Sequence, residues 1–370
     1  MASPPVLSHQ DYTVGWICAL PVEAAAGKAM LDDRHPTLHQ AKHDHNKYTL
    51  GRIGPHNVVI TCLPAGVPGT SAAAIVATQM LRTFTQIKFC LMVGVGGGVP
   101  SKEYDLRLGD VAVGLRVVQY DFGKTVQGGK FHQTGAENKP SGFLLTALAE
   151  LHSRHLMEGS HCSSHLSDAF KKYPLMEATF VSPGDSHDRV YESEYDHPEW
   201  YADCSQCEEK HLTACLPRSS QEPTIHYGVI ASGNQVMRHG ATREKLRKEI
   251  GVICFEMEAA GLIDIFPCLV VRGICDYSDS HKNKKWQPYA AMTAACYAKE
   301  FLTEIGAAQV EEISAVAERT VQSGKCALES FSQVPRTDLG VLKCEEDMVS
   351  INTQVQIPLS RQFVKLSPVI

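Results

Sequence analysis

The sequence predicts an α/β fold in which helices cover both faces of a central sheet. Apolar, β-rich segments alternate with helical segments along most of the chain. Several expected strands, such as KFCLMVG at 88–94, are apolar without interruption, which is typical of strands buried on both faces. The chain has 370 residues, of which 44% are hydrophobic and 21% charged, and this suits one large domain with an appendage or two domains.

The expected elements begin at residue 12 and follow in order. A strand at 12–18 leads into a helix that opens at Pro21, because proline suits the first helical position. Two β-rich runs separated by Gly54–Pro55 predict a hairpin. The next elements are a helix at 69–84, the strand at 88–94 and a strand at 108–121.

The pattern loosens between about 123 and 223, and we interpret this segment as an insertion with one clear helix at 143–157. The core domain therefore spans 12–305. Because apolar residues become sparse after it, 306–370 are expected to form a tail that is partly helical, at 310–322, or disordered. After the insertion we expect a strand at 225–233, a helix at 242–251, a small-residue helix beginning near Glu258, a strand at 267–275 and a helix at 289–306.

Composition argues against several functional classes. The net charge of −6 gives no basic face for nucleic acid, and no apolar run is long enough to span a membrane. The first residues lack the basic and apolar regions of a secretory signal. Many of the 13 cysteines lie inside apolar runs, so we expect reduced thiols and a cytoplasmic or nuclear location.

A run of glycines follows the strand at 88–94 and comprises Gly94, Gly96, Gly97 and Gly98. It is neither a dinucleotide fingerprint, since Val99 stands at the third glycine position, nor a P-loop. The run could be a tight turn between buried strands, or a place where the backbone approaches a ligand closely. The number of glycines favours the ligand.

Acidic residues stand at places where an α/β fold binds ligands. Glu23 follows the first strand at about the third helical position, and Asp276 follows a buried strand at the same expected edge of the sheet. Asp276 is a candidate acid or base because apolar surroundings raise a carboxyl pKa. Glu258 precedes Ala259 in a tightly packed segment, whereas Glu256 is expected to be structural.

Two histidine and cysteine groups raise the question of a metal. The spacing of His35, His39 and His43 could line one helix face, but Pro36 favours a solvated connection. Cys204 and Cys207 form a C-x-x-C pair that could hold a structural zinc, and no regular element frames them as a redox pair. The potential further ligands are His197, His211 and Cys215.

Basic residues follow Asp276 at His281, Lys282, Lys284 and Lys285. They are either a solvated loop before a helix or a cationic rim that attracts a phosphorylated substrate. The sequence does not decide between the two.

Five motifs, in this order, resemble those of the purine and uridine phosphorylase superfamily, and of its nucleosidase branch in particular. The likeness is closest to the fungal nucleoside-phosphorylase-like domains. It implies a mixed central sheet flanked by helices on both faces, with a long insertion. The motifs are ICALPVEA, VGVGGGVP, IASGNQVM, CFEMEAAG and VVRGICDYSDSHKNKKWQPYAA.

The resemblance also implies roles for individual residues. Glu23 matches the glutamate that handles the attacking water, and Asp276 matches the aspartate that protonates the purine at N7. Glu258 matches the residue that accepts the sugar hydroxyls. The other positions implied to bind substrate are Gly96, Gly97, Ser232, Val236, Met237, Met257 and Arg272.

The residue types suit cleavage of an N-glycosidic bond, which builds positive charge on the sugar and negative charge on the leaving base. A purine nucleoside hydrolase is expected, because ALPVE replaces the start motif of the phosphorylases and Val95 replaces their phosphate-binding serine. A phosphate-dependent phosphorylase and a nucleotide-sensing module are the alternatives. The expected partner is a purine nucleoside or nucleotide, with no metal or organic cofactor, and the chain is expected to form a homo-oligomer, with a dimer favoured.

Overall fold

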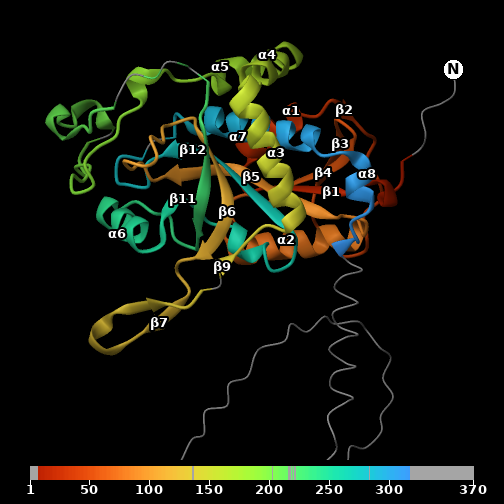
Figure 1. The fold of residues 1–370 in the computed structure, drawn as a ribbon, viewed down its shortest axis with the longest axis horizontal. Coiled ribbons are helices and arrows are strands. Elements are labelled where there is room, and N and C mark those ends of the chain that lie inside the picture. Colours follow the sequence, from red (N-terminus) through yellow and green to blue (C-terminus); the bar gives the residue numbers. More distant parts are fainter. Residues whose placement is uncertain are drawn as a thin grey trace, which may run out of the picture. The chain divides into compact units, whose positions relative to one another are not determined.

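A computed structural model describes residues 7–316, apart from positions 136, 202, 216, 217, 219, 221 and 283. In this part of the chain a mixed sheet of ten strands is flanked by helices on both faces (Figure 1), so the predicted fold class is confirmed. The strands are β1 (Val14–Cys18), β2 (Asp33–Arg34), β3 (Tyr48–Ile53), β4 (His56–Cys62), β5 (Phe89–Gly98), β6 (Val111–Gln119), β7 (Gly123–Thr125), β8 (Phe131–Gln133), β9 (Glu137–Asn138), β10 (Ile225–Ser232), β11 (Val252–Glu256) and β12 (Cys268–Asp276). The helices are α1 (Pro21–Ala29), α2 (Thr70–Thr83), α3 (Gly142–Glu158), α4 (Cys162–Lys172), α5 (Pro174–Phe180), α6 (Gly240–Ile250), α7 (Gln287–Glu304) and α8 (Ala307–Glu311).

The sheet contains a closed ring. Its order is β11-β10-β6-β12-β5-β1-β4-β3-β2, and β11 also pairs with β5. Strand β12 runs parallel to β5, whereas β11 runs antiparallel to it. As a result Gly97 pairs with Phe255 on one side and with Asp276 on the other. The ring therefore brings the ends of three strands to one place.

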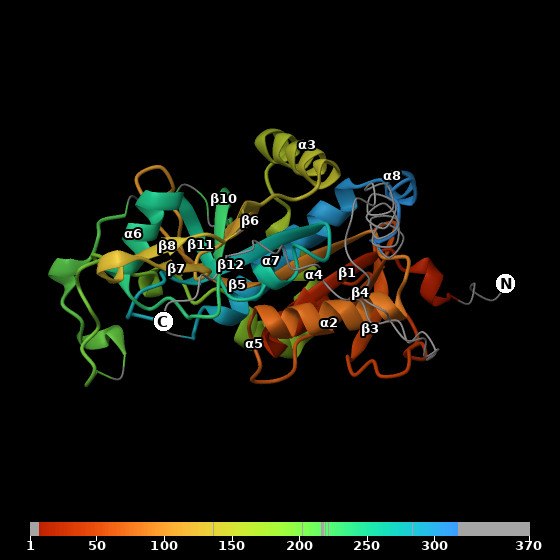
Figure 2. The ribbon, with the colours of Figure 1, turned by 90° about the horizontal axis from the view of Figure 1, so that it is seen from below.

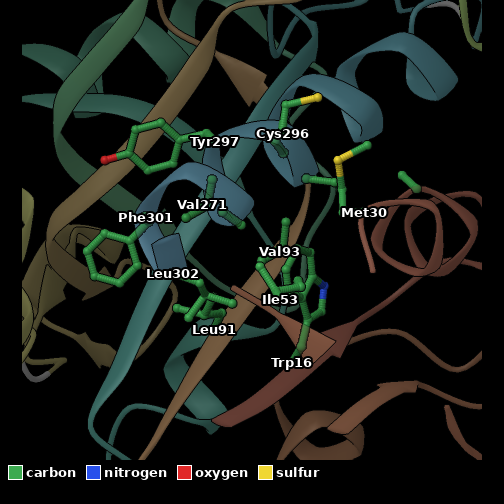
Figure 3. Packing of buried hydrophobic residues seen from close by; sticks show 14 of the residues in the cluster. Trp16, Met30, Ile53, Leu91, Val93, Val271, Cys296, Tyr297, Phe301 and Leu302 are labelled. Atoms are coloured by element: carbon green, nitrogen blue, oxygen red, sulfur yellow. The ribbon is translucent and has the colours of Figure 1, made fainter. Parts of the chain in front are cut away.

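Successive side chains along each strand point to opposite faces of the sheet, so the apolar core has two parts, one on each face. Trp16 of β1 and Leu91 of β5 belong to one apolar cluster, and their neighbours Ile17 and Met92 belong to a second. Helix α7 packs in the first cluster, where Phe301 lies close to the β-strand side chains (Figure 3). Helix α2 packs in the second, so the strands lie between helices (Figure 2).

The segment at 123–223 is partly packed and partly projecting. Figure 1 shows the hairpin of β7 and β8 extending away from the ring. In contrast, α3, α4 and α5 contact α7, and Leu144 and Leu148 of α3 belong to the same apolar cluster as α7. No helix in the described part of the chain combines the length and the apolar character needed to cross a membrane.

Two sequence-based expectations differ from the structure, and so does the turn that was one of two alternatives for the glycine run. The small-residue helix expected near Glu258 is wrong: strand β11 ends at Glu256, and only a short 3-10 helix at Ala259–Gly261 follows. The glycine run is not a turn, because β5 continues through Gly98. Of the helix expected at 310–322, α8 ends at Glu311, and the positions from 317 onward lie outside the described residues.

Candidate active site

Carboxylates from three distant segments line one cavity of about 240 Å³. Glu23 comes from the first turn of α1, Glu258 follows β11, and Asp276 ends β12. They meet because β5 is paired with β1, β11 and β12. The structure thus brings together the three acids that the sequence singled out.

Backbone groups hold Glu23 in place. Its Oε2 accepts hydrogen bonds from the N–H groups of Ala19 at 2.7 Å and Leu20 at 2.9 Å, and its Oε1 accepts one from Val95 at 2.8 Å. Burial raises the pKa of Glu23 above its usual value, although Arg272 and these donors oppose the shift. A carboxylate has about four acceptor sites, so one site remains for a further donor.

Arg272 is the cation behind this cavity and is fully buried. Its Nη2 donates to Glu256 and lies 3.5 Å from Oε2 of Glu258, and its Nη1 lies 3.4 Å from the carbonyl oxygen of Val95. Burial acts to lower the pKa of Arg272, but attraction to Glu256, Glu258 and Glu23 outweighs it and raises that pKa. One permanent positive charge thus faces three carboxylates.

Glu256 also lines the cavity, but its carboxylate is bound by groups of the protein itself. It accepts hydrogen bonds from the N–H groups of Glu258 at 3.1 Å and Ala259 at 3.0 Å, besides the ion pair with Arg272. These bonds fix the turn that presents Glu258 to the cavity.

The carboxylate of Glu258 has longer hydrogen bonds than that of Glu256. Its Oε1 is 3.4 Å from the N–H of Gly69, and its Oε2 is 3.3 Å from the N–H of Met257. Burial raises the pKa of Glu258 to about 7, since Arg272 offsets only part of the cost of desolvation. This carboxyl group therefore changes its charge near neutral pH.

Asp276 is paired with a lysine. Its Oδ2 lies 2.7 Å from Nζ of Lys282, and its Oδ1 accepts from the N–H of Ser278 at 3.0 Å. Burial acts to lower the pKa of Lys282, but the charge of Asp276 outweighs it and raises that pKa. The thiol of Cys275 lies 3.2 Å from the same Oδ2 and so contacts the acid directly.

Glycines in β5 allow these groups to approach. A Cβ at Gly94 would lie 2.6 Å from Glu23 and 2.7 Å from Nη1 of Arg272, and a Cβ at Gly97 would lie 2.2 Å from Oγ of Ser278. Gly96 and Gly97 also line the cavity. These glycines therefore allow side chains of the protein itself to come close to β5, and the approach to a ligand stays a prediction.

The predicted substrate-binding residues fall into two groups. Met257, Val236 and Met237 line the cavity, and Val236 is 52% exposed. Ser232 and Arg272 are not among the residues that line it, and a substrate-binding role for them stays a prediction. The hydroxyl of Ser232 accepts from the N–H of Ala260 at 2.9 Å and supports the turn after β11.

Several lining residues were missed or only partly anticipated. Phe255 adds an aromatic side chain to the cavity wall. It was missed because strand β11, which carries it, was not predicted. Ser278 has a positive φ of 56°, is buried, and its Oγ has no hydrogen-bond partner in the described part of the chain. Lys282 faces Asp276, whereas Lys284 and Lys285 are exposed, so only part of the expected cationic rim points outward.

The comparison with solved structures establishes the fold. Futalosine hydrolase of Helicobacter pylori strain 26695 has a TM-score of 0.52 and 18% identity, over 80% of this chain and 100% of that one. A 5'-methylthioadenosine/S-adenosylhomocysteine nucleosidase from Neisseria meningitidis has a TM-score of 0.52 and 17% identity, over 79% and 99%.

Residues 13–305 match the family model described as Phosphorylase superfamily, and the chain belongs to this superfamily. A nucleotide-binding leucine-rich repeat (NLR)-like protein of Hyaloscypha variabilis is 46% identical, over 80% of this chain and 30% of that protein. The ATP nucleosidase Cap17 of Escherichia coli is 24% identical, over 77% and 50%. A 5'-methylthioadenosine/S-adenosylhomocysteine nucleosidase of Mycobacterium bovis is 24% identical, over 78% and 95%. The chain thus spans less than a third of the first relative's length and half of the second's.

Proposed function

We propose that this chain is a purine nucleoside N-ribosyl hydrolase, which uses water to cleave the N-glycosidic bond and releases the free base and the sugar. The observation that carries the proposal is the meeting of Glu23, Glu258 and Asp276 in one cavity. The names of three relatives and neighbours, two nucleosidases and a hydrolase, are in keeping with it.

In this proposal Glu258 binds the ribose. Its ionised oxygens accept hydrogen bonds from the 2′ and 3′ hydroxyls, and its negative charge favours the positive charge that develops on the sugar. Arg272 fixes the carboxylate through the 3.5 Å contact without entering the cavity.

Asp276 and Lys282 together serve the leaving base. As the bond between C1′ and the base nitrogen breaks, its electron pair passes to the purine, which must gain a proton to leave as a neutral base. The proton of the Lys282 ammonium, 2.7 Å from Asp276 Oδ2, passes through this carboxyl group to N7. Lys282 is left neutral and regains a proton from solvent.

Glu23 orients and deprotonates the water. The one acceptor site left by its three backbone donors can take a water hydrogen, and burial raises its pKa toward that of an effective base. The water oxygen bonds to C1′ and its proton passes to Glu23.

Water is favoured over phosphate on electrostatic grounds. Glu23, Glu256 and Glu258 surround a single buried cation, Arg272. Its Nη2 faces Glu256 and Glu258 and its Nη1 faces the carbonyl oxygen of Val95, while its Nε has no partner among the described residues. A phosphate ion beside Glu23 would meet uncompensated negative charge. The same charge excess stabilises a cationic sugar in the transition state.

A second candidate is a nucleotide-cleaving module of a longer signalling protein. The observation that favours it is the 46% identity to an NLR-like protein, of which this chain spans 30%, together with the likeness to a protein named ATP nucleosidase. The chemistry of the cavity would be the same, and only the group attached at the 5′ position would differ.

A substrate panel tests the proposal. Adenosine, inosine, guanosine, methylthioadenosine and ATP are incubated with the protein in phosphate-free buffer, and free base is measured by chromatography. Release of base that is lost in the Asp276→Asn and Glu258→Gln variants is the expected result. If base release were undiminished in both variants, the assignment of the site would be wrong.

A further inference from the structure

Two thiols and one imidazole of the insertion lie close together. The ligand atoms of His197, Cys204 and Cys207 all lie within 4.8 Å of one another, and this is the one such group found among the described residues. The histidines at 35–45, in contrast, form no such group among the described residues. Cys204 and Cys207 are free thiols, and Cys207 is buried.

This donor set has the composition of a structural zinc site. Zn–S bonds of about 2.3 Å and Zn–N bonds of about 2.0 Å place tetrahedral ligand atoms roughly 3.3–3.8 Å apart. The three donors are therefore near the spacing that a zinc ion needs, and a contraction on the order of 1 Å would complete it. The spacing of Cys204 and Cys207 along the chain is also the C-x-x-C spacing of such sites.

His281 is the candidate fourth donor, but it lies outside the group of ligand atoms within 4.8 Å of one another and would have to move toward the ion. Its Nδ1 is 3.8 Å from Oδ1 of Asp279. His281 is 8% exposed, and neither of its ring nitrogens has a hydrogen-bond partner in the described part of the chain. Its ring centroid is 5.5 Å from that of His197, and its carbonyl oxygen is 3.7 Å from Sγ of Cys204. A buried imidazole with both nitrogens unsatisfied is costly, and coordination of a metal would satisfy one of them.

We propose that His197, Cys204 and Cys207 bind a structural zinc ion, with His281 completing a tetrahedral site. The ligands come from two separate parts of the chain. His197, Cys204 and Cys207 belong to the insertion, whereas His281 lies in the loop that follows Asp276. The N–H of His197 already donates to Oγ of Ser280 at 2.9 Å.

The zinc would fasten the insertion to the loop that carries Lys282. Cys204, His281 and Asp276 line a second cavity of about 390 Å³, which shares Cys275 and Asp276 with the acid-lined cavity. The ion would thus stand in the wall next to the site and fix the position of its loop. This role is independent of which bond the enzyme cleaves.

Metal analysis of the full chain tests the proposal directly. The protein is expressed with zinc, dialysed against metal-free buffer, and assayed by mass spectrometry of the metal content. We expect about one zinc per chain, as for a structural site of this kind. The Cys204→Ser/Cys207→Ser variant should lose the metal, and Cys215→Ser, which removes an exposed thiol of the same insertion, should keep it.

A second measurement uses the wild-type protein and so does not depend on how the variants fold. Thiols are alkylated with N-ethylmaleimide before and after zinc is removed by a chelator, and the modified peptides are identified. Cys204, which is only partly buried, should be protected only when zinc is bound, while the exposed Cys215 reacts in both states. His281→Ala should bind zinc more weakly but still through both thiols.

Three results would overturn the proposal. One is wild-type protein that holds no zinc after supplementation and shows no zinc-dependent protection of Cys204. Another is a Cys204–Cys207 disulfide in protein purified without reductant. The third is zinc that stays bound at the same stoichiometry in the double cysteine variant.

Discussion

Single residues set the charge of the cavity. Arg272 is the only buried guanidinium described there, and it is shared by Glu256 and Glu258 while Glu23 stands nearby. Asp276 has its own cation in Lys282. The charges are therefore balanced differently in two parts of the cavity. The glutamates near the proposed sugar position carry more negative charge than Arg272 compensates. Asp276 and Lys282, near the proposed base position, form an ion pair without net charge, in which Lys282 can donate a proton.

Replacement of Lys282 tests the proton route. We expect Lys282→Met to lower kcat by ~10²-fold or more, because general acid catalysis typically contributes ~10²–10⁴-fold. Lys284→Met, at an exposed neighbouring position, should leave kcat unchanged. The measurement is single-turnover base release, with circular dichroism as the control for folding. A rise in kcat on loss of Lys282 would show that the lysine only blocks Asp276.

The raised pKa of Glu258 links stability to pH. Its pKa of about 7 in the folded protein lies above the ordinary value of 4.5, so the folded state holds this proton more tightly than the unfolded state does. The contribution to stability is complete below pH ~4.5 and is lost as pH rises through ~7. Glu258→Gln should thus gain in Tm relative to the wild type between pH 5 and pH 8.

Differential scanning calorimetry at several pH values measures this effect. Glu249→Gln, on the exposed side of α6, is the control and should show no such trend. A difference in Tm between Glu258→Gln and wild type that stays constant from pH 5 to pH 8 would contradict the raised pKa.

At the scale of elements, strand β5 is the support of the site. Its glycines let β11, β12 and α1 approach, and its pairing partners carry the acids. A Cβ at Gly96 would lie 2.4 Å from Sγ of Cys254 and 3.1 Å from the carbonyl oxygen of Phe255. Substitution there must push β11 away from β5.

We expect Gly96→Ala to lower the free energy of unfolding by about 1–3 kcal/mol, the usual cost of overpacking a core. Gly142→Ala is the control, since a Cβ there would meet no atom within 4 Å. Denaturant unfolding measures both. Adding Cys254→Ala to Gly96→Ala should restore part of the stability, because it removes the shortest of the close contacts. No recovery at all would place the strain elsewhere.

The sequence predicts much of this element arrangement. The hairpin of β3 and β4, the helix at α2 and the buried strand β12 lie where the apolar patterns indicated them. Strand β11 was missed because its apolar residues merge with the small residues that follow, and a short apolar run fits either structure. The three acids were found from motifs, but their common cavity depends on the β5–β11 pairing, which no local pattern reveals. The contact between Lys282 and Asp276 could not be predicted either. It depends on the path of the loop between them, in which Ser278 has a positive φ.

At the scale of the whole molecule, the closed ring of strands and the insertion have different roles. The ring fixes the acids, and the insertion borders the second cavity beside Asp276. A homo-oligomer, with a dimer favoured, remains a prediction that light scattering can test. The cytoplasmic location expected from the reduced thiols also remains a prediction.

The most direct test of the central claim is the identity of the sugar product. The best substrate of the panel is incubated with and without phosphate, and the products are separated by mass spectrometry. We expect a sugar with a free anomeric hydroxyl, formed at a rate that phosphate does not change. A sugar 1-phosphate formed only when phosphate is present would contradict it.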